Sequence, residues 1–263
     1  MTKPPNSSNT NIQYCSDLHL EFSENKNYVR QNPLQAVGDI LILAGDVVPF
    51  PLLKKHDDFF TYVSDHFQQT YWIPGNHEYY HSDLADRSGS FFEKIKDNVF
   101  LINNYHCMLS GVKLIFSTLW TTISIPNKWN VQQGLSDFHV ISYKENRFTP
   151  DDYNEQHAGC ISFIKRQLNE EPDKTIVVTH HVPTLLNYPE QYKGDVLNEA
   201  FAVELFDLIE ASGPDYWIYG HHHQNVEPFQ IGNTQLVTNQ LGYVRYNEHL
   251  EFDRGRLLNL KSI

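Results

Sequence analysis

YCSDLH (residues 14–19) and DILILAGD (residues 39–46) each join a short apolar run to polar side chains that follow it directly. The first run leads into Asp17 and His19, and the second leads into Asp46. The second run shows no polar alternation, which is typical of a strand that is buried on both faces. We therefore predict strands at residues 12–16 and 39–44.

The same arrangement, an apolar run followed by potential ligands, occurs at three more places. GNHE (75–78) follows the run at 71–73, THH ends the run at 174–179, and GHHH (220–223) follows the run at 216–219. Because ligands of open α/β sheets bind at the carboxyl ends of the strands, we expect all these groups to meet there. The glycines before Asp46, Asn76 and His221 allow sharp turns and a close approach of the backbone.

Seven side chains with nitrogen or oxygen donors stand at these positions, which is more than one tetrahedral zinc ion can use. Two metal ions that share a bridging carboxylate would use them all. The one-residue spacing in DxH and HxH would place each pair on one side of an extended segment. The histidine of GNHE stands beside a ligand but points the other way, free for proton transfer. The predicted ligands are Asp17, His19, Asp46, Asn76, His180, His221 and His223, and the predicted catalytic residue is His77.

The remaining elements favour an α/β or mixed-sheet architecture in a single domain of residues 1–263. Helical spacing predicts helices at 52–67, at 150–169 with Thr149 as a cap, and at 196–211 before Ser212-Gly213. Further strands are predicted at 99–102, 112–119, 226–231 and 234–238, the last two joined at Gly232-Asn233. Residues 121–149 show neither period, so we predict an irregular insertion that overhangs the cleft.

Several side chains of this insertion could stack on a base or grip a phosphate. The simpler interpretation is that its Trp and Phe pack the loop onto the domain, and that Trp120 and Trp217 belong to the core. The residues concerned are Trp129, Phe138, His139, Tyr143 and Arg147.

The composition limits the classes of partner. The 263 residues include 32 Asp and Glu against 20 Lys and Arg, a formal charge of −12, together with 14 His. So acidic a chain gains little from nucleic-acid phosphates and is repelled by an anionic membrane, so neither partner is expected. Three separate cysteines without a CxxC pair, no signal-peptide pattern and no run of roughly 18 apolar residues predict a cytoplasmic protein.

The motifs DxH, GD, GNH(D/E), H and GHxH stand here in the order that they have in the calcineurin-like metallophosphoesterases, which this sequence resembles from about Gln13 to Gly242. The resemblance implies a four-layer αββα sandwich of two mixed β-sheets with a dimetal site at the strand ends. One metal would take Asp17, His19 and His223, the other would take Asn76, His180 and His221, and Asp46 would bridge them. His77 corresponds to the family's catalytic histidine, whereas His181 and His222 match no ligand position.

The sequence is most similar to small bacterial phosphohydrolases of that family, through Leu119-Trp120-Thr121 and Asp137-Phe138. It departs from them at residues 239–243, where NQLGY replaces a proline-containing segment, and at Glu78, where Asp is commoner. These departures concern the substrate contacts and the residues behind the ligands more than the metal centre.

The donor set and the resemblance together predict a phosphoester hydrolase. A hydroxide that bridges two metal ions would attack a phosphomonoester or a small phosphodiester, and His77 would protonate the leaving group. The resemblance favours Mn, and Fe, Zn or Co suit the same ligands. A non-catalytic metal-binding scaffold is one alternative, and a nuclease, which would need a basic groove, is another.

Overall fold

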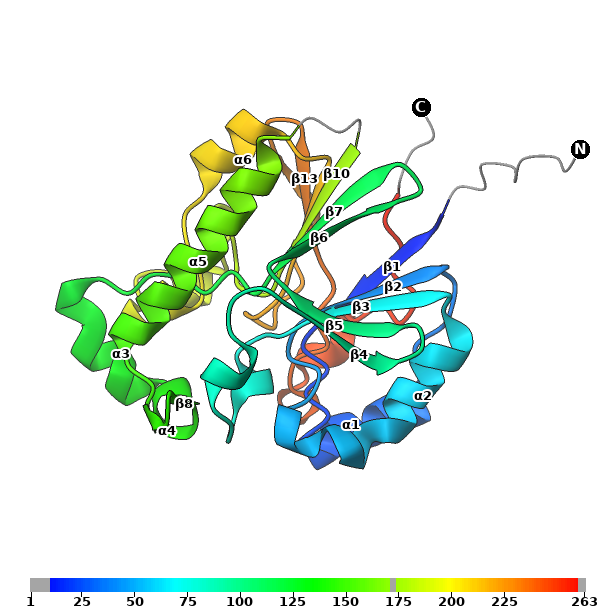
Figure 1. The fold of residues 1–263 in the computed structure, drawn as a ribbon, viewed down its shortest axis with the longest axis horizontal. Helices are drawn as coiled ribbons and strands as arrows, with labels where there is room; N and C mark the ends of the chain where they lie inside the picture. The colour runs from blue at the N-terminus through cyan, green and yellow to red at the C-terminus, as the bar shows by residue number, and fades with distance from the viewer. Residues whose placement is uncertain (1–9, 171–173, 260–263) are drawn as a thin grey trace, which may run out of the picture.

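The computed structural model describes residues 10–170 and 174–259, in which two β-sheets pack against each other with helices outside them (Figure 1). The first sheet has the strand order β1-β2-β3-β5-β4, and the second has the order β12-β13-β11-β10-β7-β6. Both are parallel except at edge strands β4, β6 and β12, so both are mixed. The predicted α/β fold with two mixed sheets is confirmed.

The strands of the first sheet are β1 (Ile12–Cys15), β2 (Ile40–Ala44), β3 (Gln69–Ile73), β5 (Val99–Asn103) and β4 (Phe91–Lys96). Those of the second are β12 (Phe229–Ile231), β13 (Thr234–Thr238), β11 (Tyr216–Tyr219), β10 (Lys174–Thr179), β7 (Val112–Ser117) and β6 (Tyr105–Leu109). β1, β2, β3, β10 and β11, the five strands that precede the predicted ligands, are joined by parallel pairings within their sheets.

Strand β2 shows why its sequence lacks polar alternation. Ile40 and Ile42 belong to an apolar layer between the sheets, where the ring of Tyr71 stacks on Phe116 of the other sheet at 5.3 Å. Leu41, which points the other way, belongs to the second apolar cluster together with side chains of α2 (Asp57–His66). In Figure 1, α1 (Ser23–Gln31) and α2 cover the outer face of the first sheet, and α5 (Pro150–Leu168) and α6 (Phe206–Ser212) lie beside the second.

Two of the predicted helices are interrupted. The stretch at 52–67 begins as a 3₁₀ helix, η1 (Phe50–His56), and becomes α-helical only in α2. The stretch at 196–211 is η6 (Val196–Ala200) followed, after a gap, by α6. In the gap the backbone pairs with Val182, which donates to the carbonyl of Phe201 and accepts from the amide of Val203, so a tertiary pairing replaces helical hydrogen bonds.

Other boundaries follow the local signals more closely. Thr149 forms a capping box with Asp152 at the start of α5, and Gly213 ends α6 with φ +54°. Among the α-helices and strands outside residues 121–149, the sequence did not predict α1, β4 and β6, which have few buried side chains. The edge strands β4 and β6 alternate partly buried with exposed positions, so they carry no long apolar run.

The segment 121–149 is not irregular, contrary to the prediction. It contains η4 (Ile125–Asn127), α3 (Lys128–Gly134), α4 (Asp137–Val140) and a small ribbon of β8 (Ser142–Tyr143) and β9 (Asn146–Arg147). Each element spans at most seven residues, which is too short to give a clear period. Phe138 is buried as expected, but Trp129 is 71% exposed, so it does not pack this segment onto the core.

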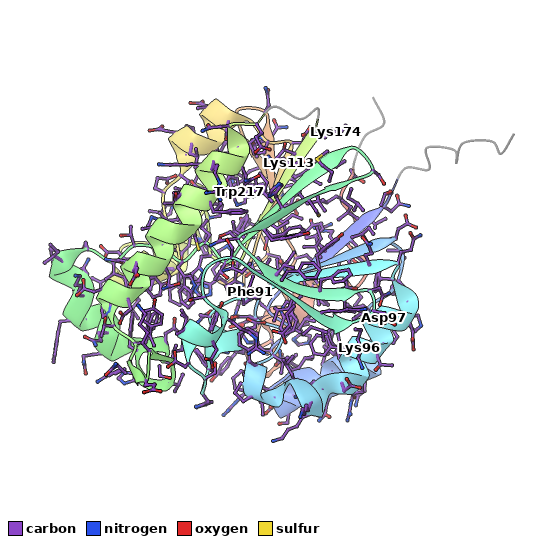
Figure 2. The ribbon with its side chains drawn as sticks, in the orientation of Figure 1. Phe91, Lys96, Asp97, Lys113, Lys174 and Trp217 are labelled. Carbon is purple, nitrogen blue, oxygen red and sulfur yellow. The ribbon has the colours of Figure 1, made fainter. Side chains whose placement is uncertain are left out.

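Two of the side chains labelled in Figure 2, Trp217 and Lys113, stand on strands of the second sheet. Trp217 on β11 is fully buried, as predicted, and its indole N–H donates to Oγ1 of Thr179 at 3.0 Å. Lys113 on β7 is also buried, and its ammonium donates to the carbonyl of Gln167 and to the carboxylate of Glu170, both at 2.7 Å. Among the helices of residues 10–170 and 174–259, none combines the length and apolar character that crossing a bilayer requires.

Candidate metal centre

A first group of ligand atoms converges where the carboxyl ends of the two sheets meet. Asp17, His19, Asp46 and His223 bring one ligand atom each within 4.8 Å of one another. The Nε2 atoms of His19 and His223 are 2.9 Å apart, and Oδ1 of Asp17 is 3.4 Å from the His223 nitrogen. These nitrogen and oxygen atoms, which come from three buried residues and the half-buried His223, are donors that suit a transition metal.

A second group contains Asp46, His180 and His221. Nε2 of His180 lies 3.4 Å from Oδ2 of Asp46 and 3.1 Å from Nδ1 of His221. The same Asp46 oxygen is 3.7 Å from Nε2 of His19 in the first group. One carboxylate oxygen therefore faces both groups, which is the position of a bridging ligand between two metals.

Two oxygens of predicted ligands lack any hydrogen-bond partner among the described residues, as does Oε2 of Glu21 beside them. One is Oδ2 of Asp46, and the other is Oδ1 of Asn76, whose amide nitrogen donates to Asp137 at 2.8 Å. An unpaired buried polar atom costs about 1–3 kcal/mol, so both oxygens call for a partner that the chain does not supply. Cations would supply it, and the residues present therefore fit a two-metal site.

The histidine ligands are held from behind by acceptors that fix their tautomers. Nδ1 of His19 donates to Glu21 at 3.2 Å, and Nδ1 of His223 donates to Glu248 at 2.9 Å. Nδ1 of His180 donates to the carbonyl of Ala44 at 2.9 Å. With the proton on Nδ1, each Nε2 presents its lone pair to the centre, as in metalloproteins where carboxylates orient ligating histidines.

The electrostatics of the first group favour a positive charge there. Burial disfavours the charged imidazole of His223, yet the carboxylates of Asp17 and Glu248 raise its pKa to about 10. Likewise burial raises the pKa of Asp46, but the imidazoles of His180 and His77 outweigh it and hold this pKa well below its usual range. Carboxylates that remain ionised when buried are suited to a cation.

Glu78 holds the two loops that carry Asp46 and Asn76. Its fully buried carboxylate accepts from the amides of Asp46 (2.9 Å), Val47 (2.7 Å) and Gly75 (2.6 Å) and from the indole of Trp72 (3.1 Å). Glu78 therefore supports the ligand loops from behind without belonging to either ligand group, as the sequence analysis suggested.

Five of the eight predicted site residues have a positive φ, a region that is strained for residues other than glycine. The spacing argument that placed DxH and HxH on one side of an extended segment is therefore wrong in its geometry, because turns bring each pair to the centre. The five values are +56° at Asp17, +46° at His19, +55° at Asp46, +79° at His221 and +54° at His223.

Glycines let these turns pack against the ligands. A Cβ at Gly75 would lie 2.2 Å from Oδ1 of Asp46 and 2.5 Å from Nε2 of His180. At Gly220 it would lie 2.6 Å from Oδ2 of Asp17. Any larger residue would displace the ligand beside it.

His77 lies beside the centre, with its ring 4.4 Å from that of His19 rather than turned away. Its Nδ1 donates to Glu21 at 2.8 Å, and its Nε2 lies 3.5 Å from the hydroxyl of Tyr243. Burial opposes protonation, but the carboxylates of Asp46 and Glu21 raise the pKa of His77 above its ordinary value.

His181 and His222 lie outside both groups of ligand atoms. Nδ1 of His181 lies 3.2 Å from the carbonyl of Thr118, and burial lowers the pKa of the imidazole to about 3. Nδ1 of His222 accepts from Gln240 at 3.0 Å, and burial lowers its pKa to about 4. Both therefore remain neutral and buried.

A cavity of about 370 Å³ opens beside the centre. Its lining includes Asp46, Asn76, His77, His221 and His223 of the centre, together with residues 134–137 and several residues between 188 and 201. The insertion thus overhangs the cleft as predicted, but through Gly134, Leu135, Ser136 and Asp137. The insertion residues that the sequence suggested for substrate contact, Trp129, Phe138, His139, Tyr143 and Arg147, are absent from the described lining.

The comparisons with known proteins agree with this geometry. Residues 11–225 match the family model described as calcineurin-like phosphoesterase. The chain belongs to the calcineurin-like phosphoesterase family. It is also 30% identical to the uncharacterized protein L509 of Acanthamoeba polyphaga mimivirus, over 94% of this chain and 98% of that one.

Among solved structures, the fold is similar to that of the phosphopantetheinyl hydrolase PptH from Mycobacterium tuberculosis. The TM-score is 0.72 at 15% sequence identity, over 95% of this chain and 96% of that one. At this identity the likeness concerns the fold alone.

Two residues of the centre, Glu21 and Glu248, were not found from the sequence. Glu21 stands two positions after His19, a spacing that could have drawn attention to it. Glu248 stands 25 positions after His223, in the short 3₁₀ helix η8 (Glu248–Glu251), and no sequence pattern links the two.

Proposed function

We propose that this protein is a metal-dependent phosphoesterase that hydrolyses a small phosphoester. The observation that carries the proposal is the unpartnered Oδ2 of Asp46, which faces both groups of ligand atoms. We assign Asp17, His19 and His223 to one metal, Asn76, His180 and His221 to the other, and Asp46 to both. When bound, the two ions would supply Lewis-acid activation of water and of the phosphoryl oxygens.

The chain itself supplies the proton for the leaving group. The hydrogen bond from Nδ1 of His77 to Glu21 fixes the ring and leaves Nε2 toward the cavity, beside Tyr243. A proton on Nε2 would pass to the departing oxygen, which is the role of a general acid. Glu21 acts as a positioning residue because it holds the ring that moves the proton.

The alternatives from the sequence are a metal-binding scaffold and a nuclease. The complete set of ligand positions and the buried His77 favour an enzyme over a scaffold. The cavity favours a small substrate over a nucleic-acid strand, since a strand needs a basic groove and the described lining contains no Lys or Arg. We propose Mn as the metal, with Fe, Zn or Co as the other ions that these ligands suit.

The test is reconstitution with each of Mn, Fe, Co and Zn, followed by metal analysis and by turnover of paired aryl phosphate monoester and diester substrates. His77→Ala should keep both metals while kcat falls by about 10²–10⁴-fold. Asp46→Ala should lose the two-metal centre. His106→Ala, a control at an exposed histidine on β6, should change neither the metal content nor kcat. Two bound ions without hydrolysis of either substrate would instead support the scaffold.

A further inference from the structure

The cavity beside the metal centre has an acidic lining. Its described lining includes the carboxylates of Asp137, Asp195 and Glu248 in addition to Asp46, but no Lys or Arg. The neighbouring Lys193 is not part of the lining, and its ammonium pairs with Glu190. A second negative group on a substrate would therefore find no basic partner there.

The carboxylates of this lining already have partners within the protein. Asp137 accepts from the hydroxyl of Tyr80 at 2.9 Å and from Asn76, Asp195 accepts from the amide of Leu197, and Glu248 holds His223. They are parts of the fold rather than free ligands, so a negatively charged leaving group could not displace them. It would be brought next to like charges in a partly buried space, which is unfavourable without a counter-ion.

Aromatic rings occupy much of the remaining wall. Tyr80 stacks on His77 with ring centres 4.1 Å apart, and Phe201 stacks on His221 at 4.5 Å. Tyr192, which is partly exposed, also lines the cavity, with the buried Tyr188 packed behind it at a distance of 6.3 Å between ring centres. Such rings offer broad apolar faces with hydroxyl groups at their edges, which suits a planar or apolar ligand.

We propose that the site accepts phosphoesters whose leaving group is aromatic or otherwise apolar and carries no negative charge of its own. This inference rests on the proposed function, since it assigns the phosphoryl group to the metal centre and the leaving group to the aromatic cavity. A volume of about 370 Å³ lies at the lower end of ligand pockets, which fits a small leaving group. Nucleoside polyphosphates and carboxylated esters are excluded by the same reasoning.

The test measures binding, so it does not depend on turnover. Calorimetry of the metal-loaded full chain compares phenylphosphonate, 4-carboxyphenylphosphonate and methylphosphonate, none of which is a phosphoester. We expect the carboxylate to weaken binding by about tenfold or more relative to phenylphosphonate. We expect loss of the ring, in methylphosphonate, to weaken it by about tenfold as well.

Two arginine variants make the charge argument specific. Ser136 is exposed and lines the cavity, so Ser136→Arg should reduce the preference for phenylphosphonate over its carboxylated form at least about threefold. Ser90→Arg, at an exposed position before β4, should leave the preference unchanged. Equal or tighter binding of the carboxylated probe by the unaltered protein, or no binding of any probe, would overturn the inference. The expected order of binding without hydrolysis of any phosphoester would support the inference and refute the proposed function alone.

Discussion

Glu78→Gln tests whether one buried carboxylate holds the loops of the metal centre together. Each carboxylate oxygen accepts two N–H groups, Oε1 from Val47 and Trp72 and Oε2 from Asp46 and Gly75. Glutamine has the same shape, but it places an NH₂ group where one of these oxygens was. Whichever oxygen is replaced, two buried N–H groups lose their acceptor and meet another donor.

The expected loss follows from these contacts. Each unsatisfied buried donor costs about 1–3 kcal/mol, so the variant should lose about 2–6 kcal/mol of its free energy of unfolding. This is a large part of the roughly 5–15 kcal/mol that a typical domain has. We also expect weaker metal binding, because the amide of Asp46 is one of the four donors that Glu78 holds.

The assay is urea unfolding at pH 9, because burial and the charge of Asp46 raise the pKa of Glu78 to about 8 and the carboxyl group must be ionised to accept all four N–H groups. A chelator is present, which separates the stability of the fold from metal binding. Metal titration of the folded variant follows. Glu227→Gln is the matched control, since it makes the same chemical change at an exposed glutamate and should shift stability by less than about 0.5 kcal/mol. A loss below about 1 kcal/mol for Glu78→Gln, at an unchanged denaturant slope, would refute the reasoning.

Three further predictions concern the same fold. Glu248→Gln should weaken metal binding by about 10–100-fold, measured by titration, because the carboxylate orients His223; unchanged affinity would contradict that role. Thr149→Ala should cost about 1 kcal/mol in thermal or urea unfolding through loss of the capping box, and an unchanged midpoint would argue against it. Removal of metal with a chelator should lower the melting temperature, since a ligand at 100 times its Kd adds about 2.7 kcal/mol to the free energy of unfolding. In Gly75→Ala the new Cβ should displace Asp46, so the melting temperatures with and without chelator should become nearly equal.

The local sequence predicted the elements whose residues are buried on both faces or which carry explicit end signals. The structure agrees with the strand predicted from the apolar run of β2, with the helix N-cap at Thr149 and with the helix end at Gly213. The prediction of secondary structure from the local sequence failed where tertiary contacts compete with local preference. The segment after Ala200 pairs with Val182 instead of continuing as a helix, and edge strands such as β4 expose alternate side chains and give a weak signal.

The sequence alone was sufficient to select the eight candidate residues, because each stands at the end of an apolar strand and parallel strands present those ends together. It did not reveal Glu21 and Glu248 as the carboxylates behind the histidines, or the aromatic wall of the cavity. Glu21 meets His77 across 56 positions of the chain and Glu248 meets His223 across 25, so these hydrogen bonds form only when the chain has folded. The sequence alone therefore predicted which polar residues follow the strands. The orientation of the ligands and the character of the cavity were determined only by the tertiary structure.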